Sequence, residues 1–211
     1  MERTTRRQEL KQWDERFRSG SYPQDPDPSP LLRRYVGELP DGRALDIATG
    51  TGRNAVFLAA SGYTVDAIDQ SYEGLKIARE NASRRGVESR INWIRADVSA
   101  HAFPTDRYAL ITVSFYRCLD RFADVKEALA PGGCVFVEHH LRSSDPTPGG
   151  ASDDRYRYAA NELLHSCLDL TVLHYDEAIE RPSEGKGRAT ARLLARKSTG
   201  TRQPYPLRPQ H

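Results

Sequence analysis

The sequence predicts an α/β domain with a doubly wound, mostly parallel sheet of seven strands that ends in an antiparallel hairpin. Three observations predict it. Short apolar segments alternate with amphipathic segments between residues 43 and 141, as in strands joined by helical crossovers. The fourth apolar segment, at 108–115, is continuous, as in strands that are buried on both faces. The last two strand-like segments, at 169–180 and 188–197, are joined by a short glycine-containing connection, which favours antiparallel pairing.

Composition agrees with one globular domain and excludes several other classes. Charged residues make up 28% and hydrophobic residues 38% of 211 residues, and the net charge is +2. This balance gives no argument for a nucleic-acid partner, and no apolar stretch approaches the roughly 20 residues of a membrane span. The three scattered cysteines show neither a disulfide framework nor paired metal spacing. Since the first thirty residues do not resemble a signal peptide, we expect a cytoplasmic protein without a membrane partner.

The N-terminal part is predicted to be a lead-in or lid rather than part of the sheet. Residues 1–9 are polar and basic, and we expect them to be disordered. Leu10, Trp13 and Phe17 recur at helical spacing and predict a short amphipathic helix over 10–17. Four prolines in 21–30 exclude regular structure there, and a second short helix is expected over 31–36.

The remaining elements follow in order from residue 43. The sequence predicts strands at 43–48, 63–69, 91–97, 108–115, 134–141, 169–180 and 188–197. It predicts helices at 53–60, 71–85, 120–129 and 156–167. We therefore divide the chain into the lead-in 1–30, a domain over 31–198, and a Pro-rich tail over 199–211 that we expect to be disordered.

The first strand is followed by a glycine turn that opens the first crossover helix. Gly50 and Gly52 allow a sharp bend and close approach of a ligand. Asp69 lies nineteen residues after Gly50, at the end of the second strand, where a carboxylate accepts hydrogen bonds from ribose hydroxyls. The segment through Ala55 also fits the G-x-G-x-x-A pattern of dinucleotide-binding proteins. These features indicate an adenosine-containing ligand without deciding between a nicotinamide cofactor and another one.

Three further features favour a cationic adenosyl cofactor over a dinucleotide. Asp46 lies within the first strand, where a dinucleotide fold normally has an apolar residue and where a carboxylate suits a cofactor with a free amino group. Asp97 ends the third strand, in position to accept from an adenine amino group. The antiparallel ending of the sheet is not expected of a dinucleotide fold.

The segment DIATGTG resembles motif I of the class I S-adenosylmethionine-dependent methyltransferases, (D/E)-x-G-x-G-x-G, and Pro131-Gly132-Gly133 before the fifth strand is also typical of them. The resemblance covers residues 40–197 and implies the Rossmann-like fold of that family and S-adenosylmethionine as cofactor. Ala48 replaces the first glycine, at a site expected to need small size more than positive φ. The implied cofactor-binding residues are Asp46, Ala48, Gly50, Gly52, Asn54, Asp69, Gln70, Ser71, Asp97, Val98 and Ser114.

WDERF, PSPLL and ALDIATGTGRNAVFLA-x-x-G together resemble the tellurite-resistance/thiopurine methyltransferase branch. That resemblance implies an N-terminal segment folded over the cofactor, and soft acceptors such as thiols or chalcogen oxyanions. Two interpretations of the first helix stay open. Either Trp13 stacks on the methionine end of the cofactor and Arg16 pairs with its carboxylate, or the helix packs on the body with Arg16 in solvent.

Acceptor-side residues are expected at the carboxyl edge of the fourth and fifth strands, where open α/β sheets bind ligands. Tyr116 and Arg117 follow Ser114 there, and His139 and His140 end the fifth strand. The two histidines are predicted to contact substrate or to act as a general base. Neighbouring residues of a strand point to opposite faces, so we expect no metal site.

The predicted activity is methyl transfer from S-adenosylmethionine to a small acceptor. An N- or O-methyltransferase acting on a small metabolite, and a binding protein without turnover, remain alternatives. An RNA methyltransferase is disfavoured because Ser-Phe-Tyr-Arg follows the fourth strand in place of an (Asn/Asp)-Pro-Pro-Tyr motif. The oligomeric state is left open.

Overall fold

The computed structural model describes residues 2–144, 150–151, 153–180 and 187–200. These fall into two compact units, one formed by residues 1–37 and 41–102 and the other by 38–40 and 103 onward. The predicted tail over 199–211 lies, apart from 199–200, outside the described residues.

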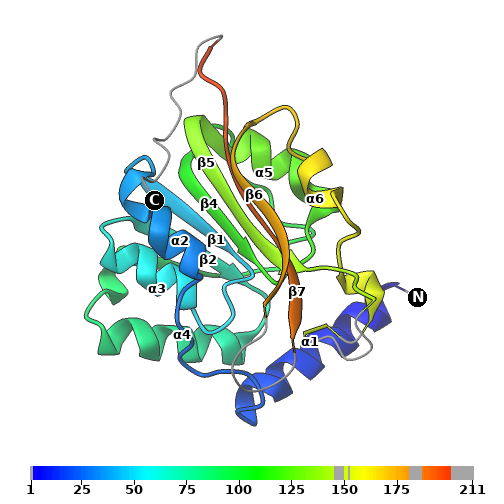
Figure 1. Ribbon diagram of the computed structural model, residues 1–211. Helices are drawn as coiled ribbons and strands as arrows, with labels where there is room; N and C mark the ends of the chain where they lie inside the picture. The colour runs from blue at the N-terminus through cyan, green and yellow to red at the C-terminus, as the bar shows by residue number, and fades with distance from the viewer. Residues whose placement is uncertain (1, 145–149, 152, 181–186, 201–211) are drawn as a thin grey trace. The chain divides into compact units, whose positions relative to one another are not determined.

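The first unit contains three parallel strands, β1 (Arg43–Ile47), β2 (Thr64–Asp69) and β3 (Ile91–Arg95), hydrogen-bonded in the order β3-β2-β1. Helices α3 (Arg53–Ala60) and α4 (Tyr72–Arg84) provide the crossovers, with the 3₁₀ turn η2 (Glu88–Arg90) before β3 (Figure 1). The side chain of Ser71 caps α4 by accepting from Gly74 N. All three strands and both helices were predicted from the sequence.

The N-terminal segment forms α1 (Glu2–Arg18), α2 (Pro30–Tyr35) and the turn η1 (Val36–Glu38). Helix α1 packs against α4. It begins at Glu2, so the expected disorder of residues 1–9 is wrong for residues 2–9. Arginine, glutamate, glutamine and leucine in this stretch all have high helix propensity, and the helix therefore extends ahead of its apolar face.

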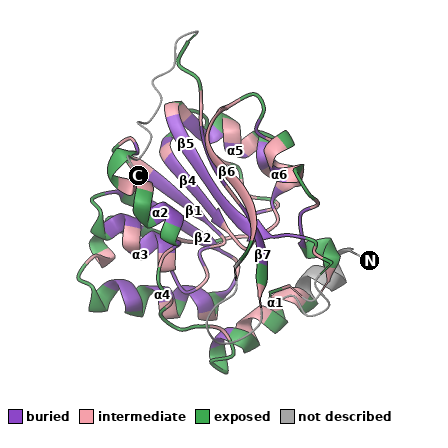
Figure 2. Ribbon diagram, in the orientation of Figure 1, coloured by how far each residue is buried: buried purple, intermediate pink, exposed green. Residues whose placement is uncertain are grey.

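The second unit contains β4 (Tyr108–Ser114), β5 (Leu129–His140), β6 (Thr171–Glu180) and β7 (Arg188–Arg196). Strand β4 is parallel to β5, whereas β7 is antiparallel to both β5 and β6. Figure 2 shows β4 and β5 largely buried and β6 mostly intermediate, as expected for central and edge strands. The helical elements are η3 (Leu119–Arg121), α5 (Phe122–Ala128), η4 (Asp154–Tyr156) and α6 (Glu162–His165).

Two elements of this unit differ from the prediction. Strand β5 begins at Leu129, because the Pro-Gly-Gly segment lies within it rather than before it. A Cβ on Gly133 would lie 2.7 Å from the Tyr108 carbonyl oxygen, so glycine is required where the two backbones meet. The helix expected over 156–167 is reduced to α6, because Tyr158 forms a parallel bridge with Leu141 and holds that backbone extended.

Among the described residues, hydrogen bonding joins the strands of a seven-stranded sheet in the order β3-β2-β1-β4-β5-β7-β6. The chain runs outward from β1 through β3 and then outward again from β4, which is the strand order of a doubly wound sheet. The predicted fold class, with its antiparallel ending, is therefore confirmed. None of the helices in the described ranges is long and apolar enough to cross a membrane.

Candidate cofactor site

The turn between β1 and α3 contains three alternate residues in the left-handed region. Ala48 has φ 54°, Gly50 has φ 55° and Gly52 has φ 83°. The expectation that position 48 needs small size more than positive φ is wrong, because alanine adopts there a conformation that favours glycine. A Cβ on Gly52 would lie 2.8 Å from the Ala78 Cβ. Glycine at position 52 is thus required for both the turn and the packing of α3 against α4.

The side chain of Asp46 stabilises the glycine turn by two hydrogen bonds. Its Oδ2 accepts from the hydroxyl of Thr49 at 2.6 Å and from the amide of Ala55 at 3.2 Å. The residue is only 2% exposed, and its carboxylate ties the end of β1 to the first turn of α3. The structure therefore gives Asp46 a part in building the turn, while contact of Asp46 with a cofactor stays a prediction.

Asp69 bonds to the turn from the neighbouring strand. Its Oδ2 accepts from Gly50 N and its Oδ1 from Ser71 N, both at 2.8 Å. Burial raises the pKa of Asp69 to about 6, because the loss of hydration outweighs the hydrogen bonds from the backbone amides of Ser71, Gly50 and Gln70, and the negative charge of Asp46 adds to it. A carboxylate has about four lone-pair sites, so the three amides leave acceptor capacity on Asp69.

Three amides of this turn donate within the protein. Thr49 N donates to the Ile68 carbonyl at 3.0 Å and Gly52 N to the Thr49 carbonyl at 2.8 Å, while Gly50 N donates to Asp69. Dinucleotide-binding turns point free amides at a pyrophosphate. Here the turn instead has the buried carboxylate of Asp69 beside it, which can still accept hydrogen bonds from a ligand. That arrangement favours a ligand which offers hydroxyl donors over one which offers a phosphate.

Several other predicted residues lie at the ends of β2 and β3 in the same unit. Ser71 follows Gln70, and its hydroxyl donates to Asp14 of α1. The Gln70 carbonyl accepts from Arg95 at 3.4 Å. Asp97 Oδ1 accepts from Ser99 N at 2.9 Å, which closes a turn in the loop after β3, and the neighbouring Val98 is buried. The glycine turn, Asp69 and Ser71 are thus joined by hydrogen bonds, while Asp97 and Val98 follow the adjacent strand.

Helix α1 brings an aromatic residue that the prediction did not assign to the site. The ring of Phe17 is 3.6 Å from where a Gly50 Cβ would lie and 3.1 Å from the equivalent point on Gly74, and Phe17 is 3% exposed. Trp13 packs beside Phe17 with ring centroids 5.8 Å apart, and the Arg16 guanidinium lies 4.9 Å from the Trp13 ring. The WDERF segment contained this signal, since Phe17 shares the helix face of Trp13.

Asn54 is buried in the first turn of α3, where its Oδ1 accepts from Ser29 N at 3.4 Å. It therefore contacts the chain just before α2. Contact of Asn54 with a cofactor stays a prediction.

In the second unit, the predicted acceptor-side residues follow β4 and end β5. Ser114 is paired with Glu138 in the sheet, and the next residue, Phe115, has φ 56°. Tyr116 follows it and is half-buried. Phe115 stacks on His140 with centroids 4.6 Å apart. Within this unit the residues around 114–117 and the two histidines are therefore brought together.

His139 and His140 are buried and neutral. His139 Nε2 donates to the Tyr156 carbonyl at 2.7 Å, so its unprotonated nitrogen is Nδ1, which has no hydrogen-bond partner in the described part of the chain. Burial lowers the pKa of His139 to about 4 and that of His140 to about 3, and nearby charged arginines lower both further. No group of three His, Cys, Asp or Glu side chains in the described ranges is arranged to hold a metal ion.

Comparison with known proteins shows what the turn region is similar to. Residues 44–133 match the family model of a methyltransferase domain, and this range contains Asp46, both turn glycines, Asp69 and Asp97. Over this range the chain is similar to methyltransferase domains. The resemblance inferred from the motif I segment is therefore confirmed.

Curated relatives of the chain include several proteins named ubiquinone/menaquinone biosynthesis C-methyltransferase UbiE. The one from Geotalea daltonii is 34% identical over 112 residues, which cover 49% of this chain and 48% of that protein. The one from Ectopseudomonas mendocina is 28% identical over 184 residues, 72% of each chain. The chain thus spans about half the length of the first of these relatives.

Solved structures share the fold at lower identity. TehB from Haemophilus influenzae superposes with a TM-score of 0.68 at 21% identity, over 80% of this chain and 62% of that one. A structure described as showing conversion of a disulfide bond into a thioacetal group during echinomycin biosynthesis gives a TM-score of 0.65 at 20% identity, over 91% and 94%. At these identities the likeness shows the fold.

Proposed function

We propose that the chain is an S-adenosylmethionine-dependent methyltransferase that acts on a small acceptor. The observation that carries the proposal is the bonding of the glycine turn, three of whose amides donate within the protein while the buried carboxylate of Asp69 lies at the turn. A ribose diol supplies hydroxyl donors for the lone pairs of this carboxylate that the backbone amides leave open. The residues of the turn therefore fit the adenosyl group of the cofactor.

The chain's own residues divide the work of binding. Asp69 accepts the ribose hydroxyls, and Asp97 is placed after β3 for the adenine amino group. Phe17 covers Gly50 and limits access of water to that part of the turn. Bound S-adenosylmethionine supplies an electrophilic methyl group on a sulfonium, so the main task left to the protein is alignment of the acceptor.

The acceptor is proposed to be a nucleophile that needs little base catalysis, such as a thiol or a chalcogen oxyanion. The support is the low pKa of the histidine pair. To hold a proton at pH 7, His139 with a pKa of about 4 requires about 4 kcal/mol. We propose that its bare Nδ1 accepts a hydrogen bond from a water molecule whose other hydrogen is donated to the anionic acceptor, so that a thiol reacts as the thiolate after losing its proton to solvent.

A second candidate is C-methylation of a quinol ring, favoured by the names of the UbiE relatives. N- or O-methylation of a small metabolite requires a base for most acceptors, and the low pKa values of His139 and His140 make both histidines weak bases. A binding protein without turnover predicts tight binding of the cofactor and no methylated product.

Product formation over an acceptor panel tests these proposals together. Labelled S-adenosylmethionine is incubated with the chain and an aryl thiol, tellurite, a demethylquinol, a catechol or a primary amine, and release of S-adenosylhomocysteine is scored. We expect turnover with the thiol or tellurite. Turnover with the quinol alone selects the second candidate, whereas calorimetric binding without any product selects the binding protein. If S-adenosylmethionine does not bind to the folded chain, the entire proposal is wrong.

A further inference from the structure

Residues 19–29, which join α1 to α2, form a strap that bonds to the glycine turn itself. The hydroxyl of Thr51, the residue between the two turn glycines, donates to the Pro23 carbonyl at 3.2 Å. Asn81 of α4 donates through one nitrogen to two carbonyls, that of Gln24 at 2.8 Å and that of Thr51 at 2.9 Å. One side-chain amide therefore bonds the strap and the turn simultaneously.

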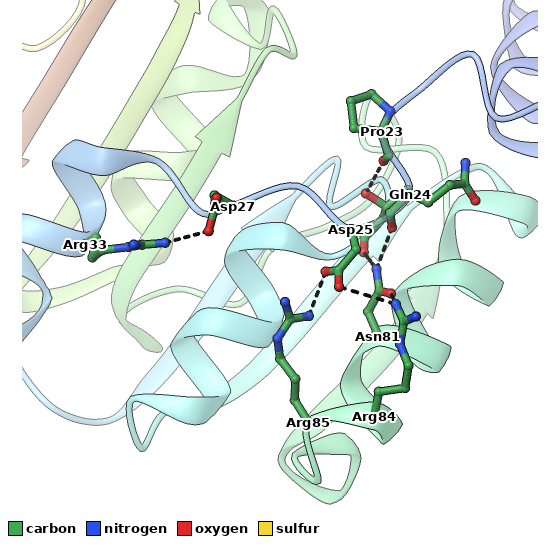
Figure 3. A network of polar contacts seen from close by, with 9 residues as sticks. Pro23, Gln24, Asp25, Asp27, Arg33, Asn81, Arg84 and Arg85 are labelled. Atoms are coloured by element: carbon green, nitrogen blue, oxygen red, sulfur yellow. Dashed lines mark hydrogen bonds and ion pairs between the residues drawn. The ribbon is translucent and has the colours of Figure 1, made fainter.

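The orientation of the Asn81 amide follows from its neighbours. The Arg84 guanidinium donates to Asn81 Oδ1, and a guanidinium has no acceptor atom, so the nitrogen must face the two carbonyls. Figure 3 shows Asn81 between the strap and Arg84, with Asp25 of the strap reaching both Arg84 and Arg85. Asn81 is 2% exposed, and water therefore does not replace a lost partner without rearrangement.

We propose that Asn81 is a positioning residue of the cofactor turn, and that its shared amide makes docking of the strap and binding of a ligand in the turn stabilise each other. If the strap leaves, one N–H of Asn81 and the hydroxyl of Thr51 lose their acceptors in the protein and must bond to water instead. The Thr51 carbonyl then accepts from an Asn81 side chain that the strap no longer holds in place, and the turn becomes less rigid. The inference rests on the proposed function for the identity of the ligand.

Hydrogen exchange measured by mass spectrometry tests the coupling, with S-adenosylhomocysteine as the probe on the full chain. In the wild type, we expect the probe to protect amides of both the turn (48–55) and the strap (19–29). Asn81→Asp keeps an oxygen for Arg84 and removes both donors. In this variant, we expect about tenfold weaker binding and protection of the turn without protection of the strap. Asp27→Asn breaks only the exposed pair between Asp27 and Arg33 and is expected to retain both effects.

The proposal is overturned if Asn81→Asp binds the probe with wild-type affinity and the probe still protects the strap. If Asn81→Asp does not fold, Thr51→Val provides the test, because it removes the bond from Thr51 to the Pro23 carbonyl and leaves Asn81 in place. In Thr51→Val, we expect the probe still to protect both the strap and the turn. Loss of strap protection in Thr51→Val would assign the coupling to Thr51 instead of Asn81. If the wild type does not bind the probe, the proposed function fails, but ligand-free exchange still tests Asn81. In the ligand-free wild type, amides of the strap and the turn must then exchange at similar rates. In ligand-free Asn81→Asp, the strap amides must exchange about tenfold faster than in the wild type.

Discussion

Asp69 is expected to make cofactor affinity depend on pH between about pH 5 and 7. Its carboxyl group has a pKa of about 6 in the ligand-free protein because it is buried. Two ribose hydroxyls that donate to the charged form favour that form and lower the pKa. Binding at pH 6 is therefore expected to release a proton from Asp69, and acid is expected to oppose binding.

The size of the effect follows from the pKa. At pH 6 about half of the ligand-free protein carries the proton, so that binding releases about half a proton per site and affinity is about twofold below its value at pH 8. At pH 5 the affinity is about tenfold lower. The same shift acts on stability with the opposite sign. Because the pKa of Asp69 in the folded state lies above the ordinary value of 3.8, the free energy of unfolding falls by about 2 kcal/mol as pH rises from about 4 to 6.

Isothermal titration calorimetry with S-adenosylhomocysteine measures the proton directly. Titrations at pH 5, 6 and 8, each in two buffers of different ionisation enthalpy, give the number of protons released. Asp69→Asn is the matched control, since it keeps the shape of the side chain and does not titrate; it is expected to bind more weakly and to release no proton. Equal affinity at pH 5 and 8 with no proton release from the wild type would refute the role of Asp69.

Three further predictions concern the turn and the histidines. Ala48→Gly is expected to raise the free energy of unfolding by about 0.5–1 kcal/mol, because relief of left-handed strain exceeds the added chain entropy; a lower melting temperature would contradict this. Gly52→Ala is expected to lower it by about 2–4 kcal/mol and to weaken S-adenosylhomocysteine binding more than tenfold, whereas Gly62→Ala, also at positive φ but in open space, tests strain alone. His140 has a folded pKa of about 3 against an ordinary value near 6.5, so the stability it contributes is lost as pH falls below about 6.5, by about 2 kcal/mol at pH 5. His140→Phe, which keeps the stack on Phe115, is expected to flatten that part of the stability profile in urea titrations, and an unchanged profile would show that His140 is not buried neutral.

Strand positions and the glycine turn were predictable from the sequence because both depend on local signals. Short segments rich in apolar residues mark β1, β2 and β4. Glycines between a strand and a helix mark a turn with positive φ, although Ala48 and Phe115 show that other residues also adopt it. The absence of a helix from most of 156–167 was not predictable from local signals. These residues suit a helix locally, but Tyr158 bonds to the backbone of His140 and Arg142, and this tertiary pairing overrides propensity.

At the site, the sequence predicted carboxylates beside the glycine turn but not which hydrogen bonds their oxygens accept. Asp46 and Asp69 were both expected to face the ligand, yet Asp46 Oδ2 is bonded within the turn. Asn81 carried no signal, because an asparagine in the middle of a helix is unremarkable until two carbonyls from distant segments meet its nitrogen. Phe17 carried a weak signal through its helical spacing from Trp13.

The internal bonding of the turn explains how one motif serves two classes of cofactor. A glycine turn with free amides stabilises negative charge, since several N–H dipoles converge on the ligand. When carboxylates such as Asp46 and Asp69 accept from those amides, the same backbone presents negative charge and spare lone pairs instead. Such a turn favours hydroxyl donors and a cationic group and opposes a pyrophosphate. The sequence pattern G-x-G-x-x-A is therefore less informative than the two aspartates around it, and replacing Asp69 is expected to change the class of ligand before it disrupts the fold.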